Sequence, residues 1–505
     1  MLTSAGQLER GFQFNMNPLR LPLLCLGAFL CHAASVDAQP IQLHPENPHY
    51  FQFRGQAIVL VTSAEHYGSV LNPDFDYVRY LDTLQKDGLN LTRLFIGTYL
   101  ERPGDFGIKW NTLAPAAGRA LTPWARSSEP GAVWGGAKFD LDKWDENFFT
   151  RLKDFVTQAD RRGVVVEVTL FSDYYGTRQS PLFKENNVNG VGDVPSEQMN
   201  TQTSNTVLAH QQRVVNRVVR EINPFDNVIF EIQNEPWVAD GVLTRVLLPS
   251  LTTADFKDPI QFWKNRVSVA SDASLAWQRL VASWITEAER SLPKRHLISQ
   301  NYANFVQPLA AIDPTISVLN FHYGWPDLVR LNYGFDRVLS VNETGFAGRE
   351  DATYRKQAWR FMLAGGGAFN SLDYSFTVGH EDGTTINEAP GGGSVALRRQ
   401  LGVLRRFLEA SPLPRMRPDN STVLHAPGTV PFVLSTADRR NVLLYLDGKG
   451  PTMLSLELPP GTYAAEWLEP ATGTILKPET VNHSGGRVTL ASPPFAEEIA
   501  LALRR

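Results

Sequence analysis

Two glutamates stand at the ends of apolar segments in this sequence. A charged side chain next to a buried segment is costly, so each of them is expected to have a specific role. Glu235 closely follows the run "VIFEIQ", and Glu343 follows "RVLSVN". Two carboxylates that face each other across a cleft are what glycosidic bond cleavage requires, because one protonates the departing oxygen while the other attacks or supports the anomeric carbon. The pair therefore predicts acid–base and nucleophilic chemistry on a carbohydrate.

Eight short apolar segments, several of them followed by helical stretches, must position these glutamates. The predicted strands are Ala57–Thr62, Leu89–Ile96, Val164–Phe171, Asn227–Gln233, His296–Gln300, Ser317–His322, Arg337–Glu343 and Ala368–Tyr374. Repeated strand–helix units are typical of a parallel sheet, and eight of them predict an α/β fold, a (β/α)8 TIM barrel. A doubly wound open sheet is the alternative, but the first strand is not followed by the glycine-rich phosphate loop of that fold.

Side-chain alternation predicts that both glutamates lie on one rim of the barrel. Glu231 and Glu235 share one face of the fourth strand, and Val341 and Glu343 share one face of the seventh. Sites in such barrels are built where the strands end. If these faces point inward, the two carboxylates meet at the upper rim.

The motifs "NEP" after the fourth strand and "ETG" after the seventh resemble those of the clan A retaining glycoside hydrolases, especially glycoside hydrolase family five with its cellulase and mannanase relatives. The resemblance covers about Phe51–Leu408. It implies that Glu235 is the acid/base, that Glu343 is the nucleophile, and that Asn234 binds the sugar 2-hydroxyl.

Three more residues match the same family. Arg93 on the second strand corresponds to the arginine that orients the nucleophile, although a structural ion pair with Glu231 is the other interpretation. His322 and Tyr323 correspond to a histidine and a tyrosine after the sixth strand, which the family commonly separates by one residue. Here they are adjacent, so the sequence leaves open which of them reaches the site, and packing in the core is the alternative.

The eighth strand departs from the family, because it ends "LDYSF" where a tryptophan platform is usual. This makes Asp373 and Tyr374 candidate substrate contacts and argues against a cellulase specificity. Further candidate contacts lie in loops after barrel strands, namely Glu65, His66, Trp237 and Trp325. Indole rings stack on the apolar faces of sugars, whereas Glu65 and His66 could equally cap the next segment.

The composition of the chain limits the classes of partner molecule that we expect. The chain has 505 residues, a formal net charge of -4 and no basic run, which disfavours nucleic acid and favours a neutral oligo- or polysaccharide. No histidine spacing typical of a metal site and no G-x-S-x-G motif occur, so we predict neither a metal nor another cofactor. The oligomeric state is not indicated.

The N-terminal segment, residues 1–38, has the features of a secretory signal that starts at Met16. Its apolar stretch Leu21–Leu30 is short for a membrane span. We therefore expect a secreted or periplasmic protein that is free of the membrane after cleavage. Both cysteines, Cys25 and Cys31, would be removed with the signal. Lipid attachment at Cys31 is the lesser alternative.

The mature chain is predicted to have two domains. Residues 39–410 form the barrel, with long insertions at Tyr99–Asp140 and Pro236–Ser274, and residues 411–505 form a C-terminal all-β sandwich, because short strands there alternate with Pro/Gly turns. The apolar strands of this tail predict that one of its faces packs against the barrel.

Two alternatives to a retaining hydrolase follow from the sequence. A secreted carbohydrate-binding protein without turnover is disfavoured because Asn234, Glu235 and Glu343 are all present. An inverting hydrolase would place its carboxyl groups roughly 6.5 to 9.5 Å apart instead of about 5 Å.

Overall fold

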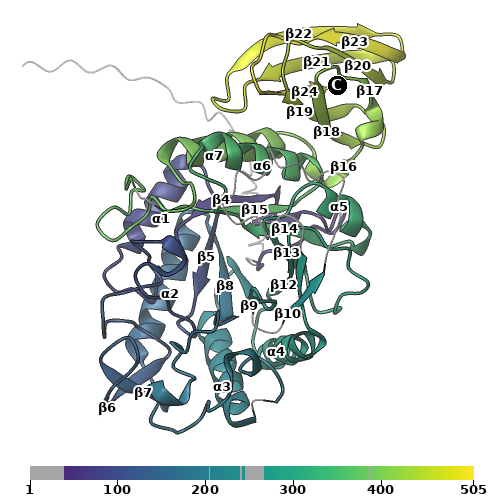
Figure 1. Ribbon diagram of the computed structural model, residues 1–505. Helices are drawn as coiled ribbons and strands as arrows, with labels where there is room; N and C mark the ends of the chain where they lie inside the picture. The colour runs from purple at the N-terminus through teal and green to yellow at the C-terminus, as the bar shows by residue number, and fades with distance from the viewer. Residues whose placement is uncertain (1–38, 204, 239–240, 245–266, 387–388) are drawn as a thin grey trace, which may run out of the picture. The chain divides into compact units, whose positions relative to one another are not determined.

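Eight parallel strands surrounded by helices form a near-closed barrel, as predicted (Figure 1). The computed structural model describes residues 39–203, 205–238, 241–244, 267–386 and 389–505, so the predicted signal segment lies outside the described residues. The barrel strands are β4 (Leu60–Ala64), β5 (Leu91–Phe95), β8 (Val165–Ser172), β9 (Val228–Asn234), β12 (Leu297–Asn304), β13 (Val318–His322), β14 (Val338–Glu343) and β15 (Ala368–Leu372). They are ordered β4-β15-β14-β13-β12-β9-β8-β5.

Every predicted strand overlaps one barrel strand, with one correction at the start. Ala57 and Ile58 belong to a separate three-stranded antiparallel sheet, made of β1 (Gln42–Leu43), β2 (Phe51–Phe53) and β3 (Gln56–Ile58). Phe51 and Phe53 share an apolar cluster with the first residues of the barrel strands, such as Val165. This cluster fills the amino end of the barrel, so the carboxyl end is left for a site.

The gap between the two end strands of the barrel is bridged by Asn90, just before β5. Its Nδ2 donates to the Val59 carbonyl oxygen at 2.8 Å, and its Oδ1 accepts from the Val61 N–H at 2.9 Å. An amide side chain thus takes the place of ladder bonds between β4 and β5.

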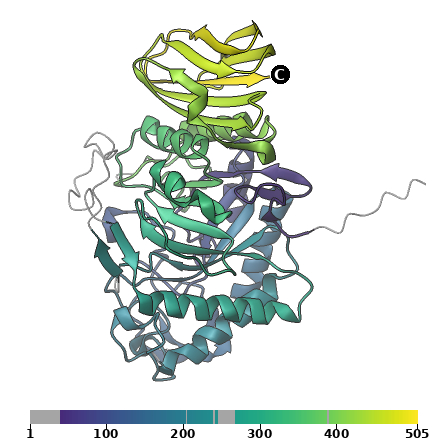
Figure 2. The ribbon, with the colours of Figure 1, turned by 90° about the vertical axis from the view of Figure 1, so that its right-hand side faces the viewer.

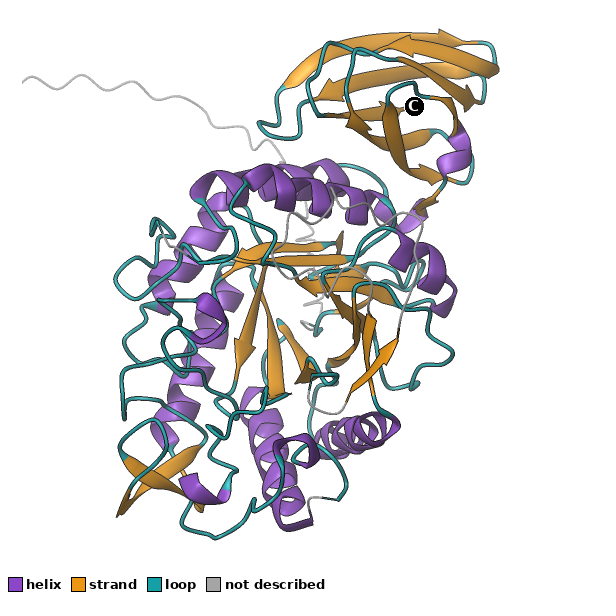
Figure 3. Cartoon of the chain, in the orientation of Figure 1, coloured by secondary structure: helices purple, strands orange, loops and turns teal. Residues whose placement is uncertain are grey.

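Seven α-helices lie in the described parts of the chain, and Figures 2 and 3 show helices outside the barrel. They are α1 (Tyr77–Asp87), α2 (Glu146–Arg161), α3 (Asn205–Ile222), α4 (Asp272–Arg290), α5 (Asp327–Asn332), α6 (Asp351–Leu363) and α7 (Val395–Glu409). Residues 305–317, all of them described, connect β12 to β13 without a helix. Among the described helices, none is both long and apolar enough to cross a membrane.

The sequence pattern of residues 146–161 explains why they form helix α2. Phe148, Leu152 and Phe155 recur at helical spacing and are fully buried. The helix begins after Asp145, whose carboxylate accepts a hydrogen bond from the Asn147 N–H and so satisfies one of the free donors of the first turn.

The two insertions contain hairpins that the sequence pattern did not indicate. Strands β6 (Trp124–Pro130) and β7 (Ala137–Trp144) pair in the first insertion, and β10 (Gly241–Thr244) pairs with β11 (Val267–Ala270) in the second. Strand β11 also extends the barrel sheet, because Val269 pairs with Ala303 of β12.

The C-terminal region is an antiparallel β domain. A six-stranded sheet has the order β16-β18-β19-β24-β21-β22, and a three-stranded sheet has the order β17-β20-β23. The strands are β16 (Met416–Pro418), β17 (Val423–His425), β18 (Thr429–Thr436), β19 (Asn441–Gly448), β20 (Met453–Leu458), β21 (Gly461–Leu468), β22 (Ile475–His483), β23 (Gly486–Ala491) and β24 (Glu498–Arg504). Apolar residues of both sheets, Leu444 and Leu456 among them, form one buried cluster between them, as in a sandwich.

The larger sheet also contacts helix α6. The Arg355 Nε donates to Glu498 Oε1 at 2.7 Å, and the Tyr445 hydroxyl donates to Glu498 Oε2 at the same distance. The Trp359 ring stacks on the Tyr445 ring at 5.4 Å between centroids, with Trp359 fully buried. An ion pair and an aromatic stack therefore join the β domain to the barrel.

Removing the carboxylate from this contact is expected to destabilise the protein. The Glu498→Ala variant leaves Arg355 buried without its charge partner, so its free energy of unfolding should fall by about 3 kcal/mol. Urea unfolding measures this. The neighbouring Glu497 is the control, because its side chain is 57% exposed and Glu497→Ala should change stability by less than about 0.5 kcal/mol. Equal effects in the two variants would contradict the prediction.

Candidate active site

The interior of the barrel is polar at mid-height. Glu231 of β9 accepts hydrogen bonds from the Nδ2 of Asn320 at 3.3 Å and of Asn342 at 2.7 Å. The same two amides donate to Glu167 of β8 at 2.8 and 3.2 Å. All four side chains are buried, so the inward direction predicted for Glu231 is confirmed. A carboxylate in such a place requires a cationic partner.

Arg93 of β5 is that partner. Its Nε and Nη2 donate to the two oxygens of Glu231 at 2.8 and 2.9 Å, and its Nη1 donates to Glu343 Oε2 at 3.0 Å. Arg93 is fully buried, and its guanidinium lies 4.6 Å from the centre of the Tyr67 ring. Both interpretations made from the sequence therefore apply, since Arg93 pairs with Glu231 and also orients Glu343.

Glu343 enters the site through a β-bulge. Regular alternation predicted that Val341 shares its inward face, and this is wrong, because the Asn342 amide points to the interior carboxylates. Between β13 and β14, Phe321 pairs with Val341. The next residue, His322, already pairs with Glu343. Asn342 is thus the extra residue of a bulge, which turns the carboxylate that follows it inward as well.

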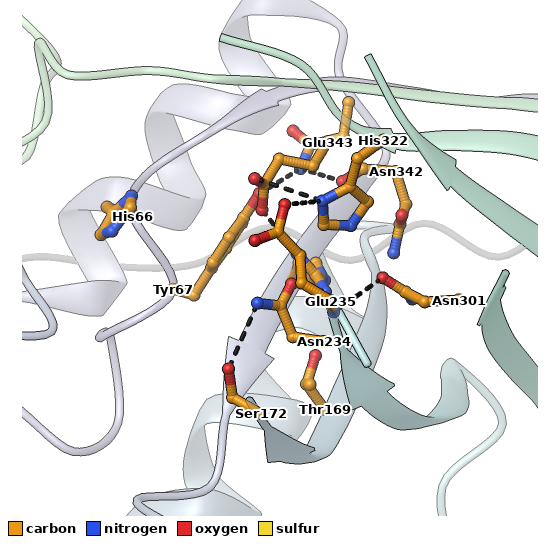
Figure 4. Close-up of polar contacts among 12 residues, drawn as sticks. His66, Tyr67, Thr169, Ser172, Asn234, Glu235, Asn301, His322, Asn342 and Glu343 are labelled. Carbon is orange, nitrogen blue, oxygen red and sulfur yellow. Dashed lines mark hydrogen bonds and ion pairs between the residues drawn. The ribbon is translucent and has the colours of Figure 1, made fainter. Parts of the chain in front are cut away.

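Asn234 ends β9 and Glu235 follows it, and Figure 4 shows the Glu235 carboxylate beside His322. The Asn234 Oδ1 accepts from Arg93 Nη2 at 2.7 Å, and its Nδ2 donates to Ser172 Oγ at 3.2 Å. Glu235 has a φ of 45°, and its N–H donates to Asn301 Oδ1 at 3.3 Å. The left-handed backbone, rather than strand alternation, sets the direction of the Glu235 side chain.

Such backbone conformations recur around the rim. Non-glycine residues with positive φ follow six of the eight barrel strands, namely Tyr67, Tyr175, Glu235, Phe305, Tyr323 and Phe346. Each costs on the order of 1 kcal/mol or more and persists only where the surrounding structure enforces it. Their gathering at the carboxyl end of the barrel marks this rim as the part of the fold shaped for function.

His322 and Tyr323 both reach the carboxylates, which answers the question left open by their adjacency. The His322 Nδ1 lies 2.8 Å from Glu235 Oε1 and 3.4 Å from Glu343 Oε1 (Figure 4). The Tyr323 hydroxyl donates to Glu343 Oε1 at 3.0 Å. Adjacent side chains can do this because Tyr323 has a φ of 54° and leaves the strand geometry.

The charge states of His322 and Glu343 depend on each other. Burial lowers the pKa of His322, but the negative charge of Glu343 and the hydrogen bond to Glu235 outweigh it and raise that pKa to about 9. Burial raises the pKa of Glu343, but His322 and Arg93 outweigh it and hold the pKa below its usual range. At neutral pH the site therefore contains an imidazolium and an ionised Glu343.

The two carboxylates are close together. One oxygen each from Glu235 and Glu343 and one nitrogen of His322 all lie within 4.8 Å of one another. This spacing suits the two carboxyl groups of a double-displacement glycosidase, which lie about 5 Å apart. The same donor atoms have the types and spacing of a divalent-metal site.

Two predicted contacts, Glu65 and Asp373, are bound by structural partners, and for Glu65 this is the capping alternative that the sequence left open. Glu65 accepts from Gly68 N–H at 3.0 Å and Ser69 Oγ at 2.6 Å, so it caps its own loop. Asp373 accepts from the buried Arg398 Nη1 at 2.8 Å and holds α7 against β15. Both carboxylates are thus engaged by structural neighbours.

The remaining predicted contacts lie in loops at the carboxyl end of the barrel strands. His66 Nε2 is 3.1 Å from Glu101 Oε2, and the His66 ring lies 6.0 Å from the Tyr374 ring. The Trp237 ring meets His322 edge-on at 5.3 Å. Trp325 packs on Phe305 at 5.7 Å and borders a cavity of about 800 Å³ whose lining includes Tyr323 and, from the β domain, Phe432 and Asp447, but neither Glu235 nor Glu343.

Sequence reasoning missed several residues of this site. Tyr175 is the most direct case, because its hydroxyl donates to Glu235 Oε2 at 2.6 Å and accepts from Asn234 Nδ2 at 3.0 Å. Its place in "FSDYYG", just after the third barrel strand, was the available signal. Glu101, Asn301 and Asn342 gave weaker signals, since polar residues in loops and at strand ends are common.

Comparison with known proteins identifies the architecture. No known family model matches the sequence, and no curated protein matches it. The solved structure of a candidate glycoside hydrolase from Bacteroides vulgatus superposes with a TM-score of 0.62 at 14% identity, over 94% of this chain and 83% of that chain. A family 5 glycoside hydrolase from the same organism gives 0.60 at 10% identity, over 92% and 93%.

This chain has the glycoside hydrolase family 5 fold. The resemblance predicted from "NEP" and "ETG" is thus confirmed for the fold. In the family 5 fold, as in other barrels of this kind, sites lie at the carboxyl ends of the strands, where Asn234, Glu235 and Glu343 stand.

The interior network supports a prediction about stability. Burial and the charge of Glu231 raise the pKa of Glu167, whereas Arg93 outweighs burial and lowers the pKa of Glu231. Glu231 therefore carries the charge that balances Arg93. We expect Glu231→Gln to lower the free energy of unfolding by about 3 to 5 kcal/mol and the matched Glu167→Gln to lower it by less than about 1 kcal/mol, both measured in urea at pH 7. Comparable losses would mean that both carboxylates are ionised.

Proposed function

We propose that this protein is an exported retaining glycoside hydrolase that cleaves the O-glycosidic bonds of a glycan. The observation that carries the proposal is the placement of the Glu235 and Glu343 carboxylates around one His322 nitrogen, with ligand atoms within 4.8 Å of one another. Arg93 keeps Glu343 oriented, and Asn234 beside it supplies an amide. Paired carboxylates at this spacing support double displacement.

The proposed reaction has two steps. Glu343 attacks the anomeric carbon, the bond from that carbon to the leaving oxygen breaks, and Glu235 gives its proton to that oxygen. The result is a glycosyl-enzyme ester. Glu235 then takes a proton from water, the water oxygen attacks the anomeric carbon, and the ester bond breaks. The sugar is released with its original configuration.

Two features favour this function over the alternatives. An inverting enzyme needs space for a water molecule between its carboxyl groups, whereas here one imidazole nitrogen contacts both of them. A binding protein has no need for a buried arginine that holds a second carboxylate in the sugar cleft, as Arg93 holds Glu343. A metal-dependent hydrolase would use the same three donors but lose activity with a chelator.

The experiment is hydrolysis of a panel of aryl glycosides and polysaccharides, with the anomer of the first product read by NMR. We expect turnover of at least one substrate, retained configuration and no loss in EDTA. A product of inverted configuration would exclude double displacement and indicate an inverting hydrolase. Inhibition by EDTA would indicate a metal-dependent enzyme. No turnover with detectable sugar binding would favour a carbohydrate-binding protein.

The pH dependence should report His322. Because its pKa is raised to about 9, kcat/KM should stay high through neutral pH and fall as the pH rises through about 9. Above that value His322 has lost the proton that it can pass to Glu235 across their 2.8 Å contact, so proton delivery through Glu235 to the leaving group should weaken. An alkaline limb near pH 6.5, the ordinary value for a histidine, would contradict this assignment.

Export is proposed from the sequence of residues 1–38. Mass spectrometry of the protein recovered from the periplasm or medium should give Gln39 as its first residue. A full-length cytoplasmic protein would refute export, and a lipid mass on Cys31 would indicate a lipoprotein.

A further inference from the structure

Three aromatic residues form a wall from the Glu235 carboxylate to the solvent. The Tyr175 hydroxyl donates to Glu235 Oε2 at 2.6 Å. The Tyr175 ring meets the Phe106 ring edge-on at 5.0 Å and lies 5.7 Å from the Tyr99 ring. Tyr99 and Tyr175 follow the neighbouring strands β5 and β8, and Phe106 lies further along the loop after β5. We call Tyr99, Phe106 and Tyr175 the aromatic wall.

The outer end of the aromatic wall is exposed to solvent. Phe106 is 44% exposed, although it contacts Tyr175. It lies in a tight turn in which the Gly104 N–H donates to the Ile108 carbonyl oxygen at 2.9 Å, and Ile108 is fully buried. Phe106 has a φ of 55°, a conformation that side chains disfavour. The turn thus presents a large apolar ring to water from a strained backbone, and such strain is typical of functional positions.

At its inner end, the aromatic wall contacts Glu235, the proposed proton donor. The Tyr175 hydroxyl accepts from Asn234 Nδ2 at 3.0 Å, so its single hydrogen is directed to Glu235 Oε2. Burial and the charge of Glu235 raise the pKa of Tyr175, which therefore remains a donor. The other oxygen of Glu235 faces His322. The wall therefore begins at the group that the proposed function assigns to leaving-group protonation.

We propose that Phe106 and Tyr175 form the platform on which the leaving group of the substrate stacks. This rests on the proposed function, because Glu235 must lie beside the departing oxygen in order to protonate it. Whatever is attached to that oxygen then extends along the wall. The C–H face of a sugar ring stacks on aromatic rings, so the ligand class is a pyranose unit on the far side of the cleaved bond of an oligo- or polysaccharide.

Double displacement provides a test of this assignment. The leaving group is present in the first step and has departed before water attacks the glycosyl-enzyme. Loss of the platform should therefore slow formation of the intermediate and spare its hydrolysis. A residue that contacts the retained sugar would affect both steps.

The experiment uses the full-length protein and an oligosaccharide that the wild type cleaves, together with the 2,4-dinitrophenyl glycoside of its retained sugar. For Phe106→Ala we expect kcat/KM on the oligosaccharide to fall about tenfold, an effect in the range of one lost aromatic contact. The rate after the dinitrophenol burst, which reports hydrolysis of the intermediate, should stay within about twofold. Phe106→Trp keeps an aromatic face and should retain kcat/KM within about threefold.

Trp110→Ala is the matched control. Trp110 lies in the same loop and is 48% exposed, but its ring packs against the Lys109 ammonium at 4.6 Å. Its loss should leave kcat/KM within about twofold of the wild type. Melting temperatures of all variants establish that they fold.

Two outcomes would overturn the platform while leaving the proposed function in place. One is unchanged oligosaccharide kcat/KM in Phe106→Ala, and the other is an equal loss in both chemical steps, which would place the ring against the retained sugar. Absence of turnover by the wild type on every glycoside would instead overturn the proposed function, and the platform with it.

Discussion

Replacing Glu343 with alanine is expected to reduce turnover by about 10⁴-fold or more, as removal of a nucleophile typically does. Arg93 Nη1 and the Tyr323 hydroxyl, which now bind the carboxylate, would remain and line the vacated space. A small anion can enter such a space. Added azide should therefore attack an activated glycoside from the side of the lost carboxylate and give a glycosyl azide of inverted configuration. Product analysis by NMR measures this.

The control for this prediction is Glu350→Ala, which removes an exposed glutamate seven positions further along the chain. It should keep full activity. Full activity in Glu343→Ala would rule out the nucleophile assignment, and a rescued product with retained configuration would assign Glu343 to the acid/base role.

Replacing Glu235 with alanine should have an effect that depends on the leaving group. Loss of a general acid costs about 10²- to 10⁴-fold when the leaving oxygen needs a proton. Oligosaccharides should therefore suffer this full loss in kcat/KM, whereas 2,4-dinitrophenyl glycosides, whose leaving group departs as an anion, should lose much less. The comparison of kcat/KM across aryl glycosides of graded leaving-group pKa measures the difference.

Azide should also act on the Glu235→Ala protein, but with the opposite stereochemistry. Here Glu343 still forms the glycosyl-enzyme, and azide replaces water in the second step, so the glycosyl azide should retain its configuration. The two variants thus act as controls for each other, because one anion gives two anomers. Equal losses on all leaving groups, or inverted azide from Glu235→Ala, would remove Glu235 from the acid/base role.

The sequence by itself predicted the architecture and the identity of the two carboxylates. Buried parallel strands are nearly continuous apolar runs, so "VVVEVTLF" and "NVIFEIQ" were readable without any partner. A carboxylate next to such a run is costly unless it has a task, and Glu235 and Glu343 were the two with motif context. Hydrophobic patterning is local, and so these features can be found from neighbouring residues alone.

Tertiary structure decided how the side chains are directed. The bulge that turns Asn342 and Glu343 inward together depends on the register between β13 and β14, which alternation within one strand does not specify. Likewise, Tyr175 comes near Glu235 because it has a φ of 50° and because β8 lies beside β9. Backbone conformation at strand ends is fixed by contacts between distant segments.

The same reason explains the structural contacts of Glu65 and Asp373. Glu65 and Asp373 stand at strand ends just as Glu235 does, and the sequence does not distinguish them. Whether a carboxylate at a strand end lies beside another candidate catalytic group or beside a purely structural partner depends on which segments pack against it. Arg398 of α7 binds Asp373, whereas the Glu235 carboxylate lies beside Tyr175 and His322. Local sequence determines which groups are present, and long-range packing determines which of them remain available for chemistry.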